Sequence, residues 1–278
     1  MNQDDSTWRE YNVHGNADDE EDQPIDLFAS SNADDEDAYE TIQYDYIDDE
    51  EDNNAETKKI KIRSETDYDK STGMSVWKGS EVMCTYLRRH SDLIHNKKVL
   101  ELGAGCGLCG LVCRMVLNPE SVLITDGDHQ VLKNLRYNAE ELNGLKLVDD
   151  ATNNIYSSSS ASTTTDDART ISCPQLIWGK NHAIKFAKQY GTQDVIIATD
   201  CVYIPHSVPK LFETINELLN NNSGVFLFVN TCASACPMET VLSIANDFGF
   251  ICLDEEFWYH DDDREEKKHP VHVFRRWS

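Results

Sequence analysis

KVLELGAGCGLCG, residues Lys98–Gly110, changes character halfway along. Val99–Leu102 supplies a short apolar run that is typical of a buried parallel strand. Gly103, Gly105 and Gly107 then alternate with other residues, and an apolar helix is expected over 108–117. Because glycine has no Cβ, a strand that breaks into such a turn lets the backbone approach a ligand closely.

A carboxylate lies one predicted strand away from this turn. Val122–Thr125 forms a second apolar run, and Asp126 follows it directly. At the carboxyl end of the neighbouring strand, this side chain can accept both hydroxyls of a ribose. The sequence therefore predicts a nucleoside ligand.

The position of the glycines relative to the strand decides between two nucleosides. Residues 105–110 match the dinucleotide pattern G-x-G-x-x-G. In that pattern the first glycine directly follows the strand, which here is Gly103, and the third would then fall on Leu108. Glu101 also suits a ligand with a cationic end better than a pyrophosphate. S-adenosyl-L-methionine, which carries an ammonium and a sulfonium, is favoured over NAD.

The remaining pattern predicts an α/β fold with a doubly wound, mostly parallel, seven-stranded sheet. Strands and helices alternate from residue 98 to residue 250, an order that calls for parallel strands with ligands at their carboxyl ends. The last two strands have no helix between them, so the final strand should be antiparallel. A strand at 59–63 and the helix after it form a small N-terminal extension. Further strands are expected at 171–177, 194–199, 224–229, 250–259 and 271–276.

The chain of 278 residues has a formal net charge of −25, and most of this charge lies at its N-terminal end. Residues 1–57 hold 21 acidic residues and one arginine, and we expect a disordered acidic tail there. The tail is either a solubilising segment or a segment that attracts a basic partner electrostatically. Residues 58–278 form the expected folded domain, with a low-complexity surface insertion at 145–170. The acidity disfavours nucleic acid as a partner, because phosphates would be repelled.

The composition also leads to expectations about the cellular compartment and about metal binding. The sequence has no long apolar window and no signal peptide, so we expect no membrane partner. Nine cysteines without a secretory signal favour a reducing compartment, the cytoplasm or also the nucleus. Cys106, Cys109 and Cys113 lie in the glycine turn and on an apolar helix, where cysteine is a small hydrophobe, so no metal is expected. Few exposed apolar stretches indicate a monomer.

Four further residues are candidates for the site. Trp77 precedes the first helix and is either a site residue or a core tryptophan. Trp178 follows the third predicted strand of the sheet, where it flanks an adenine or caps the sheet edge. Asp200 and Tyr203 follow the strand at 194–199 and either contact a substrate amine or serve as a helix cap and as packing.

These elements resemble the seven-stranded S-adenosylmethionine-dependent methyltransferases, which have a Rossmann-like fold. More narrowly, the chain looks like protein-lysine methyltransferase family 16, which includes calmodulin-lysine and elongation-factor-lysine methyltransferases. The resemblance implies that Asp200 and Tyr203 border a substrate lysine, and that the partner is a protein such as calmodulin, a translation factor or a chaperone. It rests on residues 76–77, 99–110, 125–126, 177–179 and 198–203. It implies a cofactor site at Trp77, Gly103, Ala104, Gly105, Asp126, Trp178 and Thr199.

Two other functions stay open at this point. A non-catalytic adaptor with a methyltransferase-like fold would dock a basic partner through the acidic tail. Alternatively, the enzyme methylates arginine, histidine or a small molecule. A nucleobase acceptor is disfavoured, because Cys201 and Val202 stand where the base-clamping motif D/N-P-P-Y/F has two prolines.

Overall fold

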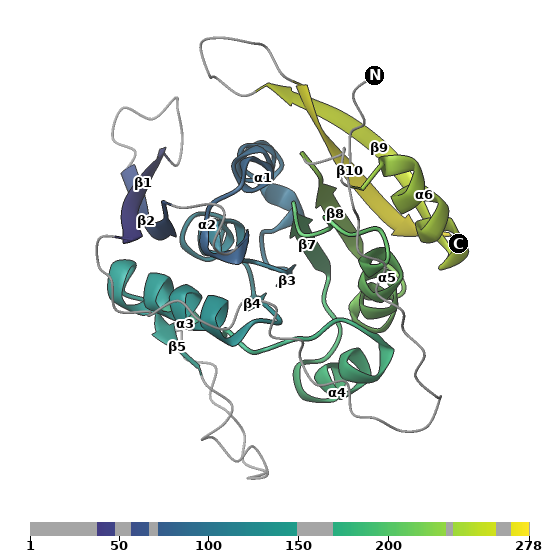
Figure 1. The fold of residues 1–278 in the computed structure, drawn as a ribbon, viewed down its shortest axis with the longest axis horizontal. Coiled ribbons are helices and arrows are strands. Elements are labelled where there is room, and N and C mark those ends of the chain that lie inside the picture. Colours follow the sequence, from purple (N-terminus) through teal and green to yellow (C-terminus); the bar gives the residue numbers. More distant parts are fainter. Residues whose placement is uncertain are drawn as a thin grey trace, which may run out of the picture.

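A computed structural model describes residues 38–47, 57–66, 72–148, 169–231, 236–259 and 268–277. Its centre is a six-stranded sheet with the order β4-β3-β7-β8-β10-β9 (Figure 1). The first four of these strands are parallel, and β10 runs antiparallel to both β8 and β9. The doubly wound sheet with an antiparallel final strand is therefore confirmed. The strands are β3 (Lys98–Leu102), β4 (Ser121–Thr125), β7 (Val195–Thr199), β8 (Val225–Val229), β9 (Phe250–Tyr259) and β10 (Lys268–Arg276).

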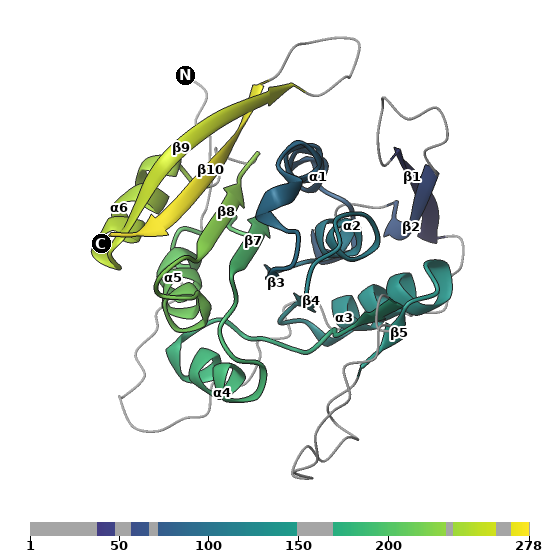
Figure 2. The same ribbon diagram turned by 180° about the vertical axis from the view of Figure 1, so that it is seen from behind.

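Helices cover both faces of this sheet (Figures 1 and 2). Alternate residues of a strand point to opposite faces, so Ile197 packs in one core and Ile196 in the other. The first core includes α1 (Lys78–Arg89), α2 (Leu108–Val116) and α3 (His129–Tyr137). The second includes α4 (Lys180–Tyr190), α5 (Ser207–Leu218) and α6 (Met238–Asp247). Short helical turns are η2 (Thr72–Met74), η3 (Ser91–Leu93) and η4 (Asn138–Leu142). No described helix is both long and apolar enough to cross a membrane.

The strand expected at 171–177 is regular only at its start. There β6 (Thr170–Ile171) pairs with the short β5 (Lys146–Leu147). Single parallel bridges then join Ser172 to Leu123 on β4 and Gln175 to Asp126, the residue after β4. Pro174 lies between these bridges, and a proline has no N–H to donate to a ladder. The segment therefore runs along the edge of the sheet beside β4 without forming a continuous seventh strand.

Part of the expected acidic tail is a strand. β1 (Tyr39–Ile47) pairs antiparallel with β2 (Thr57–Glu65), so the N-terminal extension is a hairpin rather than a single strand. Its alternate residues explain the pairing, because Tyr46 is buried in the core while Asp45 faces solvent. Residues 1–37 and 48–56 of the expected tail and residues 149–168 of the expected insertion lie outside the described residues.

Candidate functional site

A cavity of about 640 Å³ lies at the carboxyl ends of β3, β4 and β7. Its walls come from the glycine turn after β3, the start of α1, the segment before α4 and the start of α5. Nine of the ten predicted site residues line it: Trp77, Gly103, Ala104, Gly105, Asp126, Trp178, Thr199, Asp200 and Tyr203. Residues distant in sequence therefore meet at one place, as expected for the carboxyl edge of a parallel sheet.

The turn between β3 and α2 depends on glycine. Gly103 has φ 60° and Gly105 has φ 55°, which is left-handed backbone that residues with a Cβ rarely adopt. A Cβ at Gly103 would lie 2.9 Å from the Cβ of Cys201, and one at Gly105 would lie 3.0 Å from the carbonyl oxygen of Gly73. Both conformation and space thus exclude side chains from this wall of the cavity.

Asp126 holds the turn from the neighbouring strand. Its Oδ2 accepts the N–H of Gly105 at 3.1 Å, and its Oδ1 accepts the N–H of Asp128 at 3.0 Å. Burial raises the pKa of this carboxyl above its ordinary value. Each carboxylate oxygen has a second lone pair. The side chain can therefore hold the turn and still accept hydroxyls from a ligand in the cavity.

Glu101 was predicted to contact the cofactor directly, but it does not line the cavity. Strand alternation turns its side chain toward α2, where Oε2 accepts the N–H of Gly110 at 2.7 Å. Oε1 is buried without a hydrogen-bond partner in the described part of the chain. Burial raises the pKa of Glu101 to about 8. Glu101 is thus a buried acid that supports the first turn of α2.

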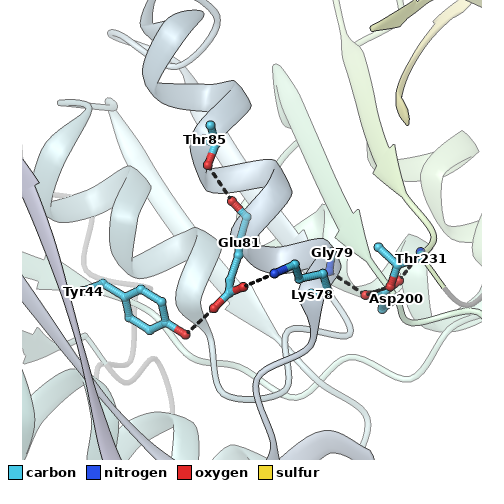
Figure 3. A network of polar contacts seen from close by, with 7 residues as sticks. All are labelled: Tyr44, Lys78, Gly79, Glu81, Thr85, Asp200 and Thr231. Atoms are coloured by element: carbon cyan, nitrogen blue, oxygen red, sulfur yellow. Dashed lines mark hydrogen bonds and ion pairs between the residues drawn. The ribbon is translucent and has the colours of Figure 1, made fainter. Parts of the chain in front are cut away.

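Asp200 is engaged by the protein itself (Figure 3). Its Oδ2 accepts the N–H of Gly79 at 2.7 Å and the hydroxyl of Thr231 at 2.8 Å. Its Oδ1 accepts the N–H of Thr231 at 2.5 Å. The residue has φ 47°, and only 9% of its surface is exposed. Asp200 therefore joins the start of α1 to the ends of β7 and β8, whereas its structural interpretation predicted a cap for the next helix, α5.

The same helix start is tied to the N-terminal hairpin. The hydroxyl of Tyr44 on β1 donates to Glu81 Oε1 at 3.1 Å, while Glu81 Oε2 lies 3.5 Å from Lys78 Nζ (Figure 3). Burial and the carboxylate raise the pKa of Tyr44. Tyr44 thus connects β1 to the first turn of α1, next to Gly79 and its bond to Asp200.

Aromatic side chains line the cavity at different depths. Tyr203 is 51% exposed and lies at the mouth. Trp77 is half-buried and donates its Nε1–H to the carbonyl oxygen of Thr72 at 2.6 Å, so it is a cavity residue rather than a core tryptophan. Trp178 is also half-buried, and it comes close to the glycine turn at Gly103.

Comparison with known proteins identifies the family of the chain. Residues 54–235 match a family model described as "Lysine methyltransferase". The chain belongs to this family. The chain is 34% identical to the protein N-terminal and lysine N-methyltransferase EFM7 of Yarrowia lipolytica, over 56% of this chain and 55% of that protein.

Two further relatives carry similar names. Protein-lysine N-methyltransferase EFM3 of Chaetomium thermophilum is 25% identical over 67% of this chain and 51% of that protein. Protein N-lysine methyltransferase METTL21A of Xenopus tropicalis is 26% identical over 72% of this chain and 75% of that protein. The chain spans about half the length of the first two relatives.

S-adenosyl-L-methionine is the cofactor that the family indicates, and the cavity fits it. Gly103 and Gly105 leave room beside the backbone, and Asp126 presents a carboxylate on the next strand. The half-buried Trp178 offers an aromatic face for an adenine. Within the described residues, no group of three His, Cys, Asp or Glu side chains could hold a metal ion.

Sequence reasoning missed two basic residues of the cavity. His206 and Lys210, at the start of α5, line its mouth together with Tyr203. Pro209 indicated only that a helix begins near this position. Which face of that helix meets the cavity depends on the packing of α5 against the sheet, and no sequence motif marks it.

Proposed function

We propose that this methyltransferase transfers a methyl group from S-adenosyl-L-methionine to the ε-amine of a lysine in a protein substrate. The observation that carries the proposal is the single cavity that joins the glycine turn and Asp126 to Tyr203 at its mouth. The names of the relatives support a protein substrate. Calmodulin, a translation factor or a chaperone each remain candidates.

The bound cofactor supplies a methyl group on a positively charged sulfur, and the protein must present a neutral amine in line with it at roughly 3 Å. With an ordinary pKa of about 10.4, a lysine is neutral only about once in a thousand near pH 7.4, which costs ~4 kcal/mol. Val76, Val131 and Leu176 contribute apolar walls that disfavour the ammonium. The proton leaves to solvent through the open mouth.

Tyr203 is the residue that we assign to the amine. Its exposed position at the mouth lets its hydroxyl accept from the incoming ammonium and then orient the neutral amine. Asp200, whose two oxygens accept from Gly79 and Thr231, acts through position: it fixes the segment that carries Tyr203. The two residues of the predicted catalytic pair therefore receive different roles.

A protein α-amine is a second candidate acceptor. The relative from Yarrowia lipolytica is named for both N-terminal and lysine methylation. An α-amine has an ordinary pKa of about 7.7–8.0, so much more of it is neutral near pH 7.4. The same apolar cavity would then deliver it at a smaller cost.

The experiment that tests the function incubates the full chain with tritium-labelled S-adenosyl-L-methionine and a cell lysate. We expect label on a protein, and fragment masses that place the methyl on a lysine or on an N-terminus. Cofactor binding without transfer would support the adaptor instead. Label on arginine, histidine or a small molecule would replace the proposed acceptor.

We also propose a monomer in the cytoplasm or the nucleus. The support for this location is that all eight described cysteines are free thiols. Light scattering on the purified chain and imaging of a tagged chain test these two points. A dimeric mass, or a signal from the secretory pathway, would contradict them.

A further inference from the structure

Four exposed lysines form a cationic strip beside the mouth of the cavity. Lys210 lies on α5, and Lys180, Lys185 and Lys188 follow along α4. The helices α4 and α5 lie side by side on the same face of the sheet (Figures 1 and 2). This strip stands out in a chain whose net charge is −25.

Among the described residues, the ion pair that these lysines form lies at the end of the strip near the cavity. Glu213 Oε2 lies 3.7 Å from Lys210 Nζ and accepts the backbone N–H of Lys180. Between residues 178 and 210 the sequence has only two acids, Asp194 and Asp200. Asp194 accepts hydrogen bonds from Lys98 N–H and from Asn220, and Asp200 is buried. Lys185 and Lys188 are exposed, and neither pairs with a carboxylate in the described part of the chain.

A small hollow of about 230 Å³ lies against the strip, between α4 and residues 174–177. One face of α4 lines it with His182, Lys185, Phe186, Gln189 and Tyr190. Leu176 and Ile177 line both this hollow and the large cavity. A chain that occupies the hollow therefore lies directly beside the cavity that receives the acceptor.

We propose that the strip and the hollow dock an acidic segment of the protein substrate, with one carboxylate side chain entering the hollow toward Lys185. This rests on the proposed function and narrows its substrate class to lysines near acidic residues. Charge complementarity of this kind selects partners and speeds their encounter. RNA is the less favoured polyanion, because residues 178–210 contain no arginine, whose planar guanidinium recognises phosphate bidentately.

The test measures the binding of two fluorescent heptapeptides to the full chain by anisotropy. Each has a central lysine, which is flanked by glutamates in one peptide and by serines in the other. We expect the acidic peptide to bind about tenfold more tightly at low salt and to lose this advantage as the salt concentration rises. The double variant Lys185→Glu, Lys188→Glu should lose that preference.

A matched control removes the effect of overall charge. Lys133→Glu with Lys146→Glu makes the same charge change at exposed positions on α3 and β5, and should keep most of the preference. Glutamate and lysine have similar helix propensities, so α4 should tolerate the reversal, which urea unfolding verifies.

Three results would overturn the proposal. The first is equal binding of both peptides, which would also be seen if residues 1–37 of this chain occupied the strip. The second is an equal loss in the two double variants, and the third is tighter binding of a single-stranded RNA of the same charge. Calorimetry with S-adenosyl-L-methionine separates this failure from that of the proposed function, since a chain that binds the cofactor but not the acidic peptide contradicts only the docking surface.

Discussion

Replacing Asp200 with alanine separates a positioning role from a direct contact with substrate. The variant leaves three donors, from Gly79 and Thr231, without their carboxylate. A hydrogen bond to a charged group contributes about 1.5–3 kcal/mol, and solvent will restore part of what is lost at this edge of the cavity. Alanine also tolerates the left-handed backbone at φ 47° less well than aspartate does, which costs roughly 1 kcal/mol more.

We therefore expect Asp200→Ala to lower the free energy of unfolding by about 3–5 kcal/mol, a large part of the 5–15 kcal/mol that is typical of a domain. Urea unfolding without cofactor measures this directly. Asp200→Asn keeps one acceptor oxygen and tolerates the left-handed backbone, so it should lose roughly half as much. If Asp200→Ala unfolds with unchanged free energy but transfers no methyl group, Asp200 contacts substrate and the positioning role is wrong.

Three further predictions concern other residues of the site. Burial raises the pKa of Glu101 from 4.5 to about 8, so its contribution to stability is fully present below pH 4.5 and is lost as pH rises to about 8. Between pH 5 and 8, the free energy of unfolding in urea should therefore change less with pH in Glu101→Gln than in the wild type. The same pH dependence in both proteins would contradict a buried acid at this position. Gly103→Ala should weaken binding of S-adenosyl-L-methionine by at least about tenfold in calorimetry, because the new Cβ would meet Cys201. The control Gly144→Ala, at φ 62° with open space around it, should bind the cofactor as the wild type does. Equal losses of affinity in the two variants would show that backbone strain alone is responsible. Tyr203→Phe should keep cofactor affinity within about twofold and slow labelled methyl transfer at least about tenfold, and an unchanged single-turnover rate would remove Tyr203 from the site.

The sequence predicted the central sheet well because its strands are buried on both faces. β7 is buried along its whole length and is apolar up to Thr199, so neither its existence nor its position depends on the identity of its neighbours. β1 was missed for the opposite reason. It is an edge strand whose outward residues include Glu40 and Asp45, and its tyrosines were outweighed by the acidic residues around them.

In the site, too, local features could be predicted from the sequence and contacts between distant elements could not. The glycine turn and Asp126 were predictable, because conformational freedom at Gly103 and a carboxylate at a strand end are local properties. The burial of Glu101 under α2 and the bonds of Asp200 to Gly79 and Thr231 depend on how distant elements pack. No spacing along the chain could specify them.

We expect the glycine turn and Asp126 together to hold an adenosine that carries a charged sulfur. Titration calorimetry of the purified chain with S-adenosyl-L-methionine, and with NAD as the competing nucleotide, tests it most directly. We predict saturable binding of S-adenosyl-L-methionine, no binding of NAD, and at least about a tenfold weaker affinity in Asp126→Ala, because a ribose would lose its carboxylate partner. Binding of NAD in preference to S-adenosyl-L-methionine, or an Asp126→Ala variant with unchanged affinity, would contradict the account.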